Sequence, residues 1–140
     1  LQRTQQTAQL ILQALGSNAP MTISDRFDEI DYGEDDGKPE EEVVARHGKA
    51  ALDAWDKEGV APPGWKVDVT ALQDHWRDFG HALSFSGHTT LVVTSNGIAR
   101  FAPILLAEAD RPAETKLKTG AYSIFEFNGH WRCVCWNQRP

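Results

Sequence analysis

Histidines and carboxylates gather between positions 74 and 81, where the residue types best suited to proton transfer lie close together in sequence. His75 and Asp78 are three residues apart, a spacing that places both on one side of a helix, and Asp74 and His81 flank them. Because the unperturbed pKa of histidine lies near neutrality, a histidine oriented by a carboxylate can act as a general acid or base. His75, Asp78 and His81 are therefore the predicted catalytic residues. The alternative is a structural His75, since it shares the apolar side of its helix with Trp76.

Metal and nucleophilic chemistry find less support in the sequence. No Ser-His-Asp order, phosphate-cradling glycine loop or H-E-x-x-H pattern is present. In a strand, Cys133 and Cys135 would point to the same face about 6.6 Å apart, which suits a disulfide poorly. No further metal ligand stands at a recognisable spacing from them. We therefore expect two core-facing cysteines, no metal site and no cofactor.

Residues 21–38 are crowded with Asp and Glu, which raises the possibility of a calcium loop. The pattern D-x-[DN]-x-[DN]-G fails with either Gly33 or Gly37 as its glycine, so a solvated acidic loop is the simpler interpretation. Phe27, Ile30 and Tyr32 are spaced among the carboxylates and are expected to anchor this loop to the core.

The composition limits the class of protein. The chain has 140 residues, of which 41% are apolar and 24% charged, as in one soluble globular domain spanning residues 1–140. A net charge of −6 disfavours nucleic acid as a partner, and no apolar run is long enough to cross a membrane. The first residue is Leu, so a removed signal peptide stays open, but we favour a cytoplasmic location.

Apolar periodicity predicts three helices in the first half of the chain. The first covers residues 5–15 with one buried side and ends at Gly16. The second runs from Pro39 through Lys57, with three glutamates at its start. Asp68 or Thr70 can cap a third helix that reaches about residue 79.

From His81 onward the apolar pattern changes to a period of two, which indicates strands. We expect five strands, near residues 81–86, 89–95, 98–107, 114–127 and 130–137. Asn96-Gly97 and Asn128-Gly129 predict hairpin turns of type I′, in which both residues have positive φ. The sequence therefore predicts an α+β fold, with N-terminal helices packed on a curved antiparallel β-sheet.

The end of the chain resembles the NTF2-like superfamily, in particular its SnoaL-like branch. The resemblance rests on the turn glycine and last strand, in Gly129, Trp131, Arg132, Val134 and Trp136. It implies a cone-shaped cup with an apolar ligand pocket. We also expect a homodimer. The residues expected to line the pocket are Tyr122, Trp76, Trp131 and Trp136.

Two functions follow from this interpretation. The first is a protein that binds a small apolar molecule, and that acts as a cofactor-free lyase, isomerase or hydrolase if it is an enzyme. The second is a non-catalytic interaction module, a homodimer through the sheet whose acidic loop faces a basic partner. A deep apolar cavity containing an ionisable group would favour the first, whereas a filled core would favour the second.

Overall fold

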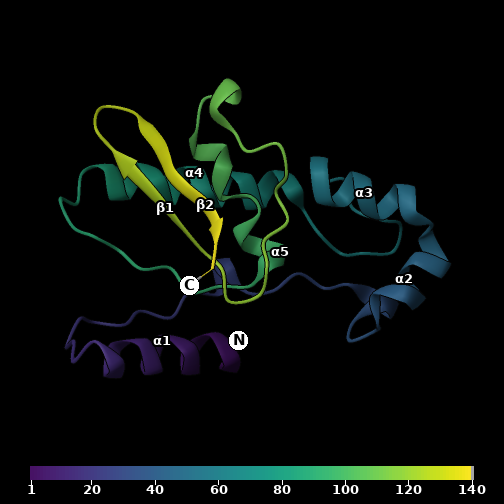
Figure 1. Cartoon of the computed structure of the whole chain (residues 1–140), viewed down its shortest axis with the longest axis horizontal. Helices are drawn as coiled ribbons and strands as arrows, with labels where there is room; N and C mark the ends of the chain where they lie inside the picture. Colours follow the sequence, from purple (N-terminus) through teal and green to yellow (C-terminus); the bar gives the residue numbers. More distant parts are fainter. Residues whose placement is uncertain (140) are drawn as a thin grey trace.

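The computed structural model describes residues 1–139 and shows a helical molecule with one small sheet (Figure 1). Its helices and strands are α1 (Gln2–Ala14), α2 (Glu40–His47), α3 (Lys49–Glu58), α4 (Val69–Ser84), α5 (Asn96–Ala99), β1 (Tyr122–Phe127) and β2 (Trp131–Gln138). Short 3₁₀ turns lie at Asp25–Phe27, Gly33–Asp35, Ala102–Leu105 and Glu108–Asp110. Two strands cannot form a curved cone-shaped sheet, so the predicted NTF2-like fold is wrong. In residues 1–139, no helix is long and apolar enough to cross a bilayer.

Local signals explain where the middle helices begin and end. The predicted helix from Pro39 through Lys57 is two helices, because Gly48 adopts φ 81° and ψ 152° between α2 and α3. Gly59 ends α3 in the left-handed conformation that glycine favours. The Asp68 carboxylate accepts a 2.9 Å hydrogen bond from the Ala71 N–H and caps α4, which confirms that predicted start.

Helix α1 forms as predicted, but its apolar side is not buried. No residue of α1 is classed as buried, and Leu10 is 64% exposed. Leu15, immediately after the helix, is 72% exposed. Figure 1 shows α1 along one side of the molecule, apart from the other helices. The expectation of a helix with one side in the core is therefore wrong for this structure.

The hairpin predicted around Asn128-Gly129 is present. β1 and β2 are antiparallel, with Phe127 opposite Trp131 and with register irregularities between Tyr122 and Phe125. Three residues remain in the loop, and of these only Gly129 has positive φ, at 76°. A type I′ turn needs two residues with positive φ, so the hairpin is confirmed but the turn type is not.

The other predicted strands are wrong because tertiary packing overrides the period-two pattern. Residues 81–84 belong to α4, residues 98–99 end α5, and residues 102–105 form the following 3₁₀ turn. Residues 91–95 are outside any helix or strand and pair with no strand in the described chain. Asn96-Gly97 begins α5 instead of turning a hairpin, because Ile98 is fully buried and holds this segment against the core.

The core lies between α3, α4 and α5. Its buried members are Ile30, Trp55, Trp76, Ile98, Phe101 and Ala102. Phe27 and Tyr32 pack against it from the acidic segment, which confirms that apolar residues anchor this loop. Phe27 lies 4.8 Å from Trp76 between ring centroids, in a tilted arrangement. The acidic segment is therefore held in place where its carboxylates can meet other elements.

Candidate functional site

A carboxylate and a guanidinium from distant parts of the chain meet beside the first turn of α1. Arg3 Nη2 donates a 3.2 Å hydrogen bond to Glu29 Oε2, and only 17% of the Glu29 side chain is exposed. The second oxygen, Oε1, accepts hydrogen bonds from the Tyr32 hydroxyl at 3.3 Å and from the Ile30 N–H at 3.2 Å. Glu29 is thus a partly enclosed carboxylate with a cation and a hydroxyl as neighbours.

The start of α5 lies directly against this carboxylate. A Cβ on Gly97 would overlap Glu29 Oε1 and would lie 2.7 Å from the Tyr32 hydroxyl, so only glycine permits this approach. Ser95 precedes α5, and its buried hydroxyl has no hydrogen-bond partner among residues 1–139. The first N–H groups of a helix have no partner within it. We call Arg3, Glu29, Tyr32 and Gly97 the Glu29 site.

Tyr32 is a fixed hydroxyl in this arrangement. Burial raises the pKa of Tyr32 well above its usual range, and the negative charge of Glu29 raises it further. Its ring packs edge-on against Trp65 with 4.7 Å between centroids. Tyr32 therefore keeps its proton at neutral pH and acts as a hydrogen-bond donor to Glu29.

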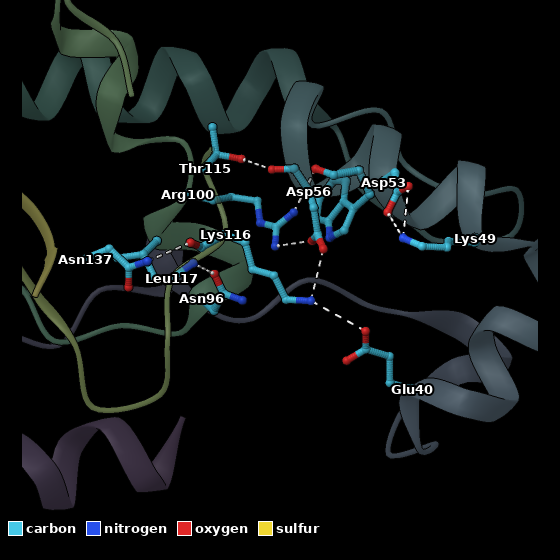
Figure 2. A network of polar contacts seen from close by, with 11 residues as sticks. Glu40, Lys49, Asp53, Asp56, Asn96, Arg100, Thr115, Lys116, Leu117 and Asn137 are labelled. Atoms are coloured by element: carbon cyan, nitrogen blue, oxygen red, sulfur yellow. Dashed lines mark hydrogen bonds and ion pairs between the residues drawn. The ribbon is translucent and has the colours of Figure 1, made fainter. Parts of the chain in front are cut away.

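The far end of α5 is anchored by a buried arginine (Figure 2). Arg100 is 2% exposed, lies 4.4 Å above the Trp55 ring, and donates to the Trp55 carbonyl at 2.8 Å. It also pairs with Asp56 at 3.2 Å, and Asp56 pairs with Lys116 at 3.0 Å. Burial lowers the pKa of Arg100, while the charge of Asp56 opposes that shift.

A second polar cluster surrounds His47. Its Nε2 lies 2.6 Å from Asp35 Oδ2, and the same oxygen accepts a 2.9 Å hydrogen bond from Trp65 Nε1. The hydrogen bond from Trp65 and then that with His47 hold the pKa of Asp35 below its usual range. An open cavity of about 490 Å³ adjoins this cluster, and we call it the His47 pocket. It is lined by Asp31, Tyr32, Gly33, Glu34, Asp35, Arg46, His47, Pro63, Gly64 and Lys66.

The charges of the His47 pocket make it a poor place for an anion. Three carboxylates and two cations line it, which leaves a net charge of −1 when His47 is neutral. Both cations are already engaged, Arg46 with Glu34 at 2.8 Å and Lys66 with Asp31 at 3.0 Å. His47 is 10% exposed at its side chain and sits at the end of α2, where its bond to Asp35 ties that helix to the acidic segment.

Comparison with known proteins gives one family. The model of the histidine phosphatase superfamily (branch 1) matches residues 1–139. The chain belongs to the histidine phosphatase superfamily. No curated protein and no solved structure matches it. Membership of this superfamily overturns the resemblance to NTF2-like and SnoaL-like proteins, which rested on a short C-terminal strand. Of the predicted enzyme classes, hydrolase is the one compatible with a phosphatase family.

In this histidine phosphatase relative, the predicted catalytic residues lie on α4 without forming a pair. His75 is partly buried and its Nδ1 has no partner, whereas Asp78 and His81 are exposed. Among residues 1–139, no hydrogen bond joins His75 or His81 to Asp74 or Asp78. Asp74 instead accepts from Arg77 at 2.6 Å, and the His81 ring packs edge-on against Phe85. Their catalytic role stays a prediction.

The residues predicted to line a ligand pocket do not share one. Trp76 is in the core and donates to the Ile98 carbonyl at 3.0 Å. Trp136 donates to the Glu114 carbonyl, Trp131 packs on Phe127, and Tyr122 is 51% exposed on the hairpin. None of these four lines either cavity described for residues 1–139.

Sequence reasoning missed the Glu29 site. Arg3 and Glu29 are 26 residues apart, and no local pattern links them. Asn96-Gly97 was a possible signal for this site. It does not distinguish a hairpin turn from a helix start against a carboxylate, because both require glycine. The predicted absence of a metal site stays a prediction, although no group of three or more potential ligands occurs in the described residues.

Proposed function

We propose that this chain binds phosphate monoesters at the Glu29 site, as the substrate-binding part of a histidine-phosphatase-type hydrolase. The observation that carries the proposal is the meeting of Arg3, Glu29 and Tyr32 with the glycine start of α5. Membership of the superfamily supplies the phosphoryl group as the ligand chemistry.

Each residue of the site has a role that follows from its chemistry. A guanidinium binds phosphate oxygens through paired N–H groups. Arg3 fits this role if its N–H groups are shared between Glu29 and the phosphate. Tyr32 donates to Glu29 Oε1 and holds that carboxyl group in position beside Arg3.

Binding rather than turnover is what this geometry supports. Phosphoryl transfer through a histidine needs an imidazole beside the phosphate. In the described residues, no hydrogen bond or ring contact joins any of the five histidines to Arg3, Glu29, Tyr32 or Ser95. We therefore expect phosphate binding by this chain, with slow or no hydrolysis of a simple ester such as p-nitrophenyl phosphate.

Titration with inorganic phosphate, followed by calorimetry, tests the proposal. Arg3→Met should weaken phosphate binding by about 10-fold or more, because a charge-assisted hydrogen bond contributes roughly 1.5–3 kcal/mol. Arg26→Met is the matched control, since Arg26 is exposed and forms no ion pair among residues 1–139. It removes the same charge and should leave binding nearly unchanged.

His47→Asn tests the competing location. We expect it to leave phosphate binding intact, because the residues that line the His47 pocket carry a net negative charge. Loss of binding in His47→Asn together with normal binding in Arg3→Met would move the site to the His47 pocket. The interaction-module alternative loses support, because carboxylates of the acidic loop pair with this chain's own Arg46 and Lys66. The homodimer and the small apolar ligand stay predictions.

A further inference from the structure

Arg100 is more deeply buried than stability alone explains. It is 2% exposed, and its Nε has no hydrogen-bond partner in the described chain. Burying a guanidinium costs free energy, and well-packed apolar residues often replace a buried ion pair without loss of stability. A buried cation with one unsatisfied N–H therefore points to a role beyond packing.

Helix α5 connects Arg100 to the Glu29 site. The helix has four residues, about 6 Å in length at 1.5 Å per residue, with Gly97 near its start and Arg100 immediately after its end. Segment 114–118 holds both ends. Asn96 Oδ1 accepts from the Leu117 N–H at 3.0 Å, and Thr115 Oγ1 donates to the carbonyl of Asp56, the carboxylate partner of Arg100, at 2.7 Å. Figure 2 shows the contact of Asn96 with Leu117 and that of Thr115 with Asp56.

The charges around Arg100 form a series of ion pairs that runs through Asp56 and Lys116 to Glu40. The negative charge of Glu29 also favours the protonated form of Arg100, alongside the larger effect of Asp56. Asp56 in turn pairs with Lys116 at 3.0 Å, and Lys116 lies 3.7 Å from Glu40. Neutralisation of Asp56 by Lys116 leaves more of the Arg100 charge acting on the Glu29 site.

We propose that Arg100 is a positioning residue for phosphate binding: it fixes the start of α5 against Glu29, and its buried charge favours an anion there. The Asp56–Lys116 pair sets how much of that charge reaches the site. This inference rests on the proposed phosphate binding at the Glu29 site. A residue that acts only through packing would not transmit changes of charge at Asp56 and Lys116.

The test measures the dissociation constant of inorganic phosphate, at low salt and at 0.5 M salt, for four variants and for the unsubstituted protein. Arg100→Met should weaken binding by about 10-fold. Asp56→Asn keeps an oxygen acceptor for Arg100 but removes the opposing charge, so it should tighten binding by about 3-fold at low salt. Lys116→Met exposes Arg100 to the full charge of Asp56 and should weaken binding. Lys57→Met is its matched control, because Lys57 is exposed and forms no ion pair within residues 1–139.

The direction of the change in phosphate affinity in Asp56→Asn separates a role of Arg100 through its charge from a role as an anchor of α5 alone. If Arg100 only anchors α5, then Asp56→Asn loosens the same anchor and weakens binding, as Arg100→Met does, and the proposal is overturned. It is also overturned if Asp56→Asn and Lys116→Met leave binding unchanged, which keeps the test valid even where Arg100→Met does not fold. If Arg3→Met fails to weaken binding, the proposed function and this inference both fail. If Arg3→Met weakens phosphate binding but Asp56→Asn does not tighten it, this inference fails and the proposed function stands.

Discussion

Glu29 Oε1 occupies the space where any side chain on Gly97 would begin. The start of α5 and the Arg3–Glu29 pair therefore form one structural unit, although they come from three distant segments of the chain. A change at any of these three positions is expected to affect the other two.

Gly97→Ala tests this unit directly. The added methyl group must displace Glu29 or Tyr32, so we expect a loss of about 1–3 kcal/mol in the free energy of unfolding. Phosphate affinity should also fall by about 10-fold. Gly80→Ala is the comparison, because its Cβ would overlap Leu105 Cδ2 of the 3₁₀ turn packed on α4. Both variants should lose stability in urea denaturation, but only Gly97→Ala should lose phosphate binding. Equal phosphate affinity in the two variants would contradict the claim that the start of α5 and the Arg3–Glu29 pair form one structural unit.

The Asp35–His47–Trp65 cluster predicts an acid limb in the stability of the protein. The pKa of Asp35 is lowered in the folded state, chiefly by the hydrogen bond from Trp65, so its contribution is present at pH values above the unfolded pKa. That contribution is lost as the pH falls below about 4 and toward the folded pKa. Urea midpoints measured from pH 2.5 to 7 should therefore fall on the acid side.

Asp35→Asn should flatten that acid limb and lower the plateau near neutrality. Asp36→Asn is the matched control, because Asp36 is exposed and makes no side-chain hydrogen bond among residues 1–139. Asp31 and Asp53 also have lowered pKa values, from their bonds to Lys66 and Lys49, so part of the limb should remain. An unchanged limb in Asp35→Asn would show that His47 and Trp65 do not stabilise its charge.

Asn137 carries the strained end of the hairpin. It has φ 57°, the only positive φ of a non-glycine residue in the described chain, and its side chain bonds to Lys118 N–H and Lys116 carbonyl. Asn137→Gly removes the two side-chain bonds but keeps the backbone conformation accessible. Asn137→Ala adds left-handed strain of about 1 kcal/mol, so it should be the less stable variant in urea. Equal stability would mean that the backbone relaxes at this position.

How much the sequence could predict depends on whether a signal was local. Asp68 as the cap of α4 and the hairpin at Asn128-Gly129 were predictable, because the signal and the structure lie within a few residues. The same dipeptide at Asn96-Gly97 begins a helix, because burial of Ile98 outweighs the turn propensity. The alternation between residues 81 and 107 was wrongly interpreted as strands. Packing outweighs the period-two pattern here as well, and parts of this segment belong to α4 and α5.

The candidate site was less predictable than the fold. Arg3 lies before the helix predicted for residues 5–15, and Glu29 lies in a segment interpreted as a solvated acidic loop. Their contact depends on the tertiary path of residues 15–29, for which the sequence carries no periodic signal. The histidines, which drew attention to α4, are not brought together with a carboxylate there, whereas His47 is, at Asp35.

Backbone amide shifts on titration with inorganic phosphate test the central claim most directly. The account predicts the largest shifts at Asn96 and Gly97, at the start of α5, and their loss in Arg3→Met but not in Arg26→Met. Shifts centred on Gly33 and Gly64, which line the His47 pocket, would contradict it. So would a response at Gly97 that Arg3→Met leaves unchanged.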